Sequence, residues 1–156
     1  MIRWIDGFYG GLIAGAVSAA FDALVMVAWE HETTLGEQFA QVARALPPFH
    51  GAATTWALVG LGLVLWLLLG VGFGIVYALL ARRVASMWRA PGSVAWGLCY
   101  GLLVWWAIND VFVPVTGALD TQPLVSGLVG TVVFYGVVLS EATTLALRRA
   151  EARRAP

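Results

Sequence analysis

Residues 7–29 read GFYGGLIAGAVSAAFDALVMVAW, an apolar stretch long enough to cross the roughly 30 Å hydrocarbon core of a bilayer as one helix. Gly7, Gly11 and Gly15 recur at every fourth position, so they lie along one face of that helix. Small residues at this spacing allow two helix backbones to approach closely inside a membrane. The stretch therefore predicts a transmembrane helix that packs tightly on a neighbour, and its one charged residue, Asp22, needs a separate explanation.

The rest of the chain also has the composition of a membrane protein. Of its 156 residues 60% are hydrophobic and 12% are charged, and the mean hydropathy is +0.83. Soluble domains carry about 25% charged residues, so this chain lacks the residues to cover its surface in water. Three further apolar stretches, at about 53–80, 94–113 and 124–147, are long enough to span a bilayer. Because backbone groups in lipid must bond within their own segment, the sequence predicts an all-α integral membrane four-helix bundle, formed as one domain by residues 1–156.

Two of the later spans repeat the glycine pattern. Gly70 and Gly74 lie in the second span, and Gly97 and Gly101 lie in the third. We therefore expect helix packing through glycine faces on three of the four helices, partly within the bundle and partly against other proteins. Trp66, near the middle of the second span, is interpreted as a packing or lipid-facing aromatic residue rather than a ligand contact.

Arginine supplies all of the basic charge and indicates the orientation. The arginines flank the spans on one side: Arg3, Arg82, Arg83, Arg89, Arg148, Arg149, Arg153 and Arg154. The loops at 30–52 and 114–123 together hold only Arg44. The positive-inside rule then predicts that both termini are cytoplasmic and that these two loops lie outside. We expect a multi-pass protein of a bacterial inner (cytoplasmic) membrane.

The first outer loop has a helical pattern of its own. Thr34 and Glu37 have the spacing of a capping box. Apolar residues follow at helical spacing until Pro47 and Pro48 end the pattern: Leu35, Phe39, Val42 and Leu46. We predict a short amphipathic helix in this loop, which lies on the outer membrane surface or rests on a neighbouring subunit.

Asp22 lies on the same helix face as the glycines of the first span, and therefore on the packing side rather than toward lipid. An unpaired carboxylate is costly in a membrane, so we expect this group to be protonated, hydrogen-bonded or hydrated. Its candidate partners are polar residues of other spans at a similar depth: Asn109, Thr54 and Thr55. Asp22 and Asn109 are expected to be buried polar residues of the bundle.

Other polar residues gather near the outer ends of the spans. His31, His50 and Glu30 have the chemistry to bind zinc or copper, but their spacing matches no metal motif, and we expect no metal site. Since no span contains a histidine, we also expect no ligand for haem or chlorophyll. Contact with a lipid, or with a quinone held by a neighbour, is compatible with the sequence. The formal net charge of zero gives no reason to expect a nucleic-acid partner.

Enzymatic function finds little support in the residues. Asp22 and Asp110 resemble the two membrane aspartates of lipoprotein signal peptidases, which are four-span proteins of this length. However, the tripeptide IND at 108–110 is followed by Val111, where that family's signature has arginine. Cys99 is the only cysteine, which excludes a redox pair within the chain, and no nucleophile with a positioned base is visible. We expect that the protein is not an enzyme.

These features favour a non-catalytic accessory or structural subunit of a larger membrane protein complex, such as a respiratory or photosynthetic electron-transfer complex. Its partners would be other integral membrane proteins and the lipid bilayer. The alternative is a small-solute or proton-coupled transporter that uses Asp22. Small multidrug-resistance transporters are four-span proteins with one essential acid in the first span, and the position of Asp22 resembles theirs.

The orientation is testable with single cysteine labels. Cysteines introduced at Thr34 and Thr121 should react with a membrane-impermeant thiol reagent from outside the cell, because both loops lack the arginines that retain a loop in the cytoplasm. A cysteine at Ser86 should react only after the membrane is opened. The reverse pattern of labelling would show that the orientation is wrong.

Overall fold

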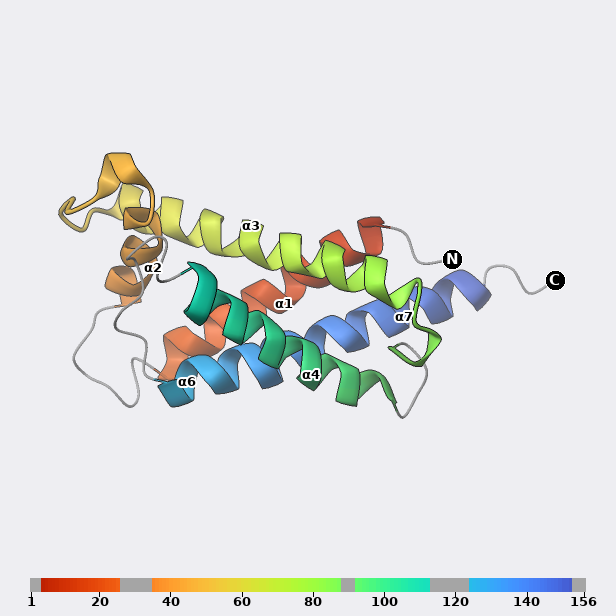
Figure 1. The fold of residues 1–156 in the computed structure, drawn as a ribbon. Helices are drawn as coiled ribbons and strands as arrows, with labels where there is room; N and C mark the ends of the chain where they lie inside the picture. Colours follow the sequence, from red (N-terminus) through yellow and green to blue (C-terminus); the bar gives the residue numbers. More distant parts are fainter. Residues whose placement is uncertain (1–3, 26–34, 88–91, 113–123, 153–156) are drawn as a thin grey trace.

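The computed structural model describes residues 4–25, 35–87, 92–112 and 124–152, and every regular element within these ranges is helical. Four helices are long and apolar enough to span a membrane: Trp4–Val25, Trp56–Ala81, Gly92–Val111 and Gly127–Ala146. They lie side by side in one bundle, in which the first helix begins at the same end as the last one finishes (Figure 1). The predicted all-α membrane bundle is confirmed. The last residues of the predicted first span, 26–29, lie outside the described ranges.

Two of the spans are single α-helices and two contain π-helical segments. The first span is α1 (Trp4–Val25) and the second is α3 (Trp56–Ala81). The third consists of α4 (Gly92–Ala107) and the π-helical η4 (Ile108–Phe112), and the fourth of α6 (Leu124–Val129), the π-helical η5 (Gly130–Val137) and α7 (Val138–Ala152). The shorter elements are α2 (Leu35–Arg44) and the 3₁₀ turns η2 (Pro47–Phe49) and η3 (Ala85–Met87). Long π-helical stretches are rare and often accompany functional sites, and the apolar pattern of these spans did not predict them.

α1 and α3 touch through their backbones near the end of the bundle where α1 begins. A Cβ atom placed on Gly74 would lie 2.5 Å from the Cα of Gly11, and one placed on Gly7 would lie 2.5 Å from the carbonyl oxygen of Gly74. Contacts this short leave no room for any side chain, so only glycine permits this approach. A Cβ on Gly15 would have more room, at 3.6 Å from the Cα of Gly70. The two helices therefore cross at Gly11 and diverge toward the end of the bundle that carries α2, as Figure 1 shows.

α4 meets the fourth span in the same way. A Cβ on Gly97 would lie 2.6 Å from the carbonyl oxygen of Gly136, and one on Gly101 would lie 2.7 Å from that of Thr131. Tyrosine hydroxyls then connect the two helix pairs across the bundle. The hydroxyl of Tyr135 donates to the carbonyl of Gly70 at 2.7 Å, and that of Tyr100 donates to the carbonyl of Phe73 at 2.6 Å. Each phenol thus buries its ring in the core while its polar end is satisfied by backbone.

α2 forms where the sequence predicted an amphipathic helix, but its apolar face covers α3 of the same chain rather than the bilayer surface or another subunit. Phe39, Ala40 and Ala43 are buried, and Ala40 and Ala43 form an apolar cluster with Leu58 of α3. A Cβ on Gly62 would overlap the backbone of Phe39, so the missing side chain at this position creates the seat for α2. α2 consequently crosses one end of α3 (Figure 1).

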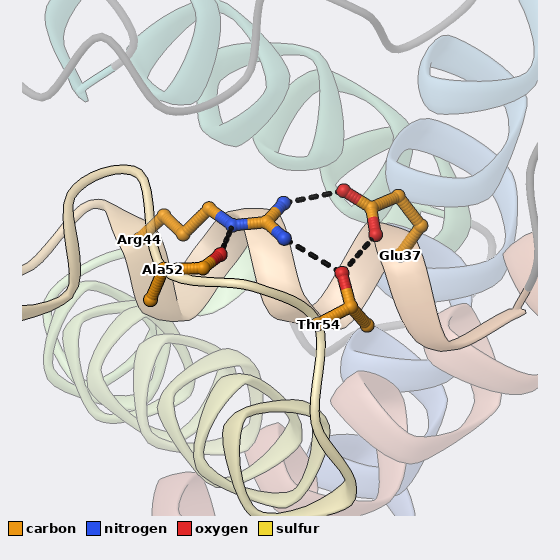
Figure 2. Close-up of polar contacts among 4 residues, drawn as sticks. All are labelled: Glu37, Arg44, Ala52 and Thr54. Atoms are coloured by element: carbon orange, nitrogen blue, oxygen red, sulfur yellow. Dashed lines mark hydrogen bonds and ion pairs between the residues drawn. The ribbon is translucent and has the colours of Figure 1, made fainter.

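A polar cluster ties α2 to the segment that leads into α3 (Figure 2). The Arg44 guanidinium donates to the carbonyl of Ala52 at 2.9 Å, to the hydroxyl of Thr54 at 2.6 Å and to the carboxylate of Glu37, and Thr54 also donates to Glu37. These two donors, Arg44 foremost, hold the pKa of Glu37 below its usual value. Thr34 of the expected capping box lies outside the described residues, and both carboxylate oxygens of Glu37 are engaged by Arg44 and Thr54.

Glu37→Gln should loosen α2 at neutral pH. Because folding lowers the pKa of Glu37, the charged cluster stabilises docking above the ordinary glutamate pKa of about 4.3, and this contribution is lost as the pH falls through the lowered value. Since an exposed ion pair contributes at most ~1 kcal/mol, hydrogen exchange of the α2 amides at pH 7 should rise by up to about fivefold. Asp110→Asn, at an exposed carboxyl, is the control and should leave α2 unchanged. Equal α2 protection in Glu37→Gln and the parent at pH 7 would contradict the role of the cluster.

Candidate functional site

Asp22 is buried against the fourth span, with 5% of its surface exposed. A Cβ on Gly130 would lie 3.3 Å from the Asp22 Cγ and would collide with its Oδ1, so the carboxyl group occupies the space where any other residue would place a side chain. The neighbouring residue Phe21 stacks on Phe134 of η5, with ring centroids 4.1 Å apart. The C-terminal part of α1 is therefore fixed on η5, and Asp22 is aimed at the first residue of that π-helical segment.

The partners that the sequence suggested for Asp22 are occupied elsewhere. The side-chain amide of Asn109 donates to the carbonyl of Trp105 at 2.8 Å, within its own helix, and Asn109 is only half-buried. Thr54 belongs to the Glu37–Arg44 cluster, and the hydroxyl of Thr55 accepts from the backbone N–H of Leu58 at the start of α3. Within the described part of the chain, Asp22 Oδ1 has no hydrogen-bond partner.

A small cavity lies where the four spans meet. Its volume is about 20 Å³, and its walls come from α1, α3, α4 and both π-helical segments. The residues that matter for its chemistry are Ser18, Trp66, Ile108, Thr131 and Tyr135. A cavity needs roughly 10–15 Å³ of such volume to hold one water molecule. The cavity is therefore large enough for a single water, and its position follows from the divergence of α1 and α3 beyond Gly11.

Ser18 and Asp22 each have a buried side-chain oxygen with no hydrogen-bond partner among the described residues. Ser18 is 1% exposed, and its Oγ has no hydrogen-bond partner among the residues that the structure describes. It lies one helical turn before Asp22 on α1, and Thr131, which also lines the cavity, directly follows Gly130. The cavity and the Asp22 carboxyl are thus adjacent along the same two elements. Unpartnered buried polar groups each cost about 1–3 kcal/mol unless water or an ion satisfies them.

Of the three residues considered for a metal site, only His50 lies in the part of the chain that the structure describes. His31 and Glu30 lie outside the described residues, and His50 is exposed after η2. Within the described ranges, no group of three or more His, Cys, Asp or Glu side chains could hold a metal ion. Asp110 is exposed in η4, and Glu141, also exposed, accepts a hydrogen bond from Ser93 at 3.2 Å.

The glycines singled out in the sequence lie at helix contacts: Gly7, Gly11, Gly15, Gly70, Gly74, Gly97 and Gly101. Three further residues were not singled out as site residues, namely Gly130, Gly136 and Thr131. Gly136 is as close to α4 as any of the others, and Gly130 accommodates Asp22. The fourth span holds Gly127, Gly130 and Gly136, and these spacings of three and six do not form the every-fourth-residue pattern of the first span. Trp66 contributes to the cavity wall.

No known family model matches this chain, and no curated protein or solved structure matches it either. The chemistry available in the described residues is a buried carboxyl group, a neighbouring cavity with hydroxyl groups, and helix faces able to make close contacts.

Proposed function

We propose that the chain is a non-catalytic membrane subunit that packs on another integral membrane protein through the outward face of α3. The observation that carries this proposal is the presence of two sets of glycines on α3. Gly62, Gly70 and Gly74 are in contact with α2 and α1, whereas Gly60 and Gly72 are exposed and a Cβ on either would meet nothing within 4 Å. The second set serves no contact in the described part of the chain.

Gly60 and Gly72 belong to one continuous strip. Exposed residues follow at every fourth position along α3: Gly60, Val64, Leu68, Gly72 and Val76. We call this strip the open glycine face. Glycine in a helix is less favourable than alanine by about 0.8–1.0 kcal/mol, and lipid chains gain nothing from its absent side chain. A second helix does gain, because its backbone approaches closely at such positions.

The cellular setting is part of the same proposal. Arg82, Arg83, Arg148 and Arg149 are exposed at the end of the bundle opposite α2, which supports cytoplasmic termini by the positive-inside rule. An arginine-flanked bundle of this kind suits an accessory subunit in a bacterial inner membrane. A respiratory or photosynthetic electron-transfer complex is the host we favour, with haem, quinone or pigment supplied by the partner.

A second candidate function is transport of protons or small solutes by way of Asp22. The observation that favours it is the buried Oδ1 without a partner, beside a cavity that all four spans line. Ionisable groups inside a membrane are frequently part of ion pathways. A transporter would need this carboxyl group to exchange its proton or cation in every cycle.

The subunit proposal predicts that Gly72→Leu loses its partner but keeps its fold. A leucine at this exposed position meets no atom of its own chain, yet it prevents close approach of another helix. Co-purification in gentle detergent, quantified by mass spectrometry, should show about tenfold less partner, which corresponds to ~1.4 kcal/mol. Circular dichroism should show unchanged unfolding.

Two matched variants complete this experiment. Gly74→Ala, two residues away on the same helix, should destabilise the fold by ~3 kcal/mol or prevent folding, because its Cβ would collide with α1. Leu103→Ala, exposed on α4, should retain the partner. Full retention of the same partner by Gly72→Leu would refute docking through the open glycine face.

The transport candidate is decided by flux in reconstituted vesicles that contain a pH-sensitive dye. Asp22→Asn preserves the shape of the side chain but deletes its titration, so a transporter should lose proton flux while remaining folded and abundant. A subunit without transport activity should show no flux above that of empty vesicles in either the parent or the variant. Equal flux above this background in both proteins would exclude Asp22 as the transporting group.

A further inference from the structure

The chain leaves α3 through a turn that carries two exposed arginines, Arg82 and Arg83. α3 has 26 residues and is therefore about 39 Å long at 1.5 Å per residue, whereas the hydrocarbon core of a bilayer is roughly 30 Å thick. The ends of α3 consequently reach the headgroup layers. Leu79 and Leu80, shortly before the turn, are also exposed, so an apolar surface leads up to the two guanidinium groups.

The turn is held by hydrogen bonds of its own and by contacts with the bundle. The backbone N–H of Arg83 donates to the carbonyl of Leu80 at 2.8 Å. Met87, at the end of η3, is buried in the core. The indole N–H of Trp96 donates to the hydroxyl of Ser86 at 3.1 Å, while much of the Trp96 ring stays exposed. Because tryptophan side chains favour the headgroup level, this contact indicates that the turn lies at the membrane interface.

The two guanidinium groups have no counter-charge in the described part of the chain. Neither takes part in an ion pair or a hydrogen bond there, in contrast to the guanidinium of Arg44, which binds the carboxylate of Glu37. The planar fork of a guanidinium matches two oxygens of a phosphate group. The phosphates available at this level of a bilayer belong to lipid headgroups. Anionic lipids are attracted more strongly than zwitterionic ones, because their headgroups add no positive charge of their own.

We propose that the turn after α3 is a binding site for one anionic phospholipid. The lipid phosphate binds Arg82 and Arg83, and an acyl chain lies along Leu79 and Leu80. An amphipathic ligand thereby meets an amphipathic surface, since the cationic and the apolar residues are about one helical turn apart on the same stretch of chain. The site depends neither on a partner protein nor on the side of the membrane that the turn faces, so it stands or falls separately from the subunit proposal.

A second arginine pair provides a matched comparison. Arg148 and Arg149 are exposed on α7 at the same end of the bundle, and they follow an exposed leucine, Leu145 (Figure 1). They lie within a helix that continues to Ala152 rather than on a turn. The turn after α3 adds a second exposed leucine and the nearby ring of Trp96 to the contact surface. We therefore expect the turn to hold its lipid more tightly than the α7 pair does.

Lipid titrations followed by native mass spectrometry of the full chain in detergent test the site. The parent, Arg82→Gln/Arg83→Gln and Arg148→Gln/Arg149→Gln each receive phosphatidylglycerol or phosphatidylcholine. An arginine near the membrane surface changes the affinity for anionic lipid about fivefold, so Arg82→Gln/Arg83→Gln should weaken the tightest phosphatidylglycerol step by at least about fivefold. Arg148→Gln/Arg149→Gln removes the same charge from the same end of the bundle and should weaken this step by less than about twofold. The parent should bind phosphatidylcholine more weakly than phosphatidylglycerol.

Equal weakening by the two double variants would show a general attraction by net charge and would overturn the site, as would equal parent affinity for the two lipids. Neither soluble glycerol phosphate nor hexaglutamate should displace the bound lipid. Displacement by the first would mean that the phosphate suffices without the acyl chain, and displacement by the second that the turn binds an acidic protein segment instead. Circular dichroism checks that both variants fold. If Arg82→Gln/Arg83→Gln does not fold, the single variants replace it, and unchanged phosphatidylglycerol affinity in both would refute the proposal.

Discussion

The backbone contact of α1 with α3 at Gly11 and Gly74 is the constraint on which the rest of the structure depends. At this contact a Cβ atom on Gly74 would lie 2.5 Å from the Cα of Gly11, so the helices meet at the closest distance available to them. Glycine contacts of this type commonly make transmembrane helices cross at an angle of about 40° rather than run parallel. Here the crossing turns the C-terminal part of α1 away from α3 and toward the fourth span.

This divergence has two consequences for the polar residues of the bundle. Ser18 faces the space that opens between α1 and α3, which becomes the central cavity, and Asp22 reaches Gly130. The divergence also leaves the N-terminal part of α3 open to α2, whose backbone packs against Gly62. Three glycines, at positions 74, 62 and 130, thus decide where three different elements can lie, each by the absence of one side chain.

The same helix also shows how a glycine pattern can serve two purposes. Gly62, Gly70 and Gly74 make contacts with other helices of the chain, whereas Gly60 and Gly72 are exposed on the surface of the bundle. The sequence pattern alone cannot tell which set of glycines makes contacts inside the chain. Residues two apart on a helix point in nearly opposite directions, and either side of α3 could be the one that packs. Only the position of α1 and α2 identifies which set remains open to a partner.

The sequence by itself determined the four spans, their helical state, the amphipathic segment that became α2 and the glycines at the helix contacts, because length, hydropathy and helical periodicity are local properties. The tertiary structure decided the neighbours. Asp22 shares a helix face with Gly11, yet Gly11 meets α3 and Asp22 meets η5, so Asn109, Thr54 and Thr55 were the wrong partners to expect. The π-helical segments, the seat of α2 on Gly62 and the cavity beside Ser18 likewise required the structure. Each depends on the angle at which two helices cross, and that angle is set by contacts between residues far apart in the chain.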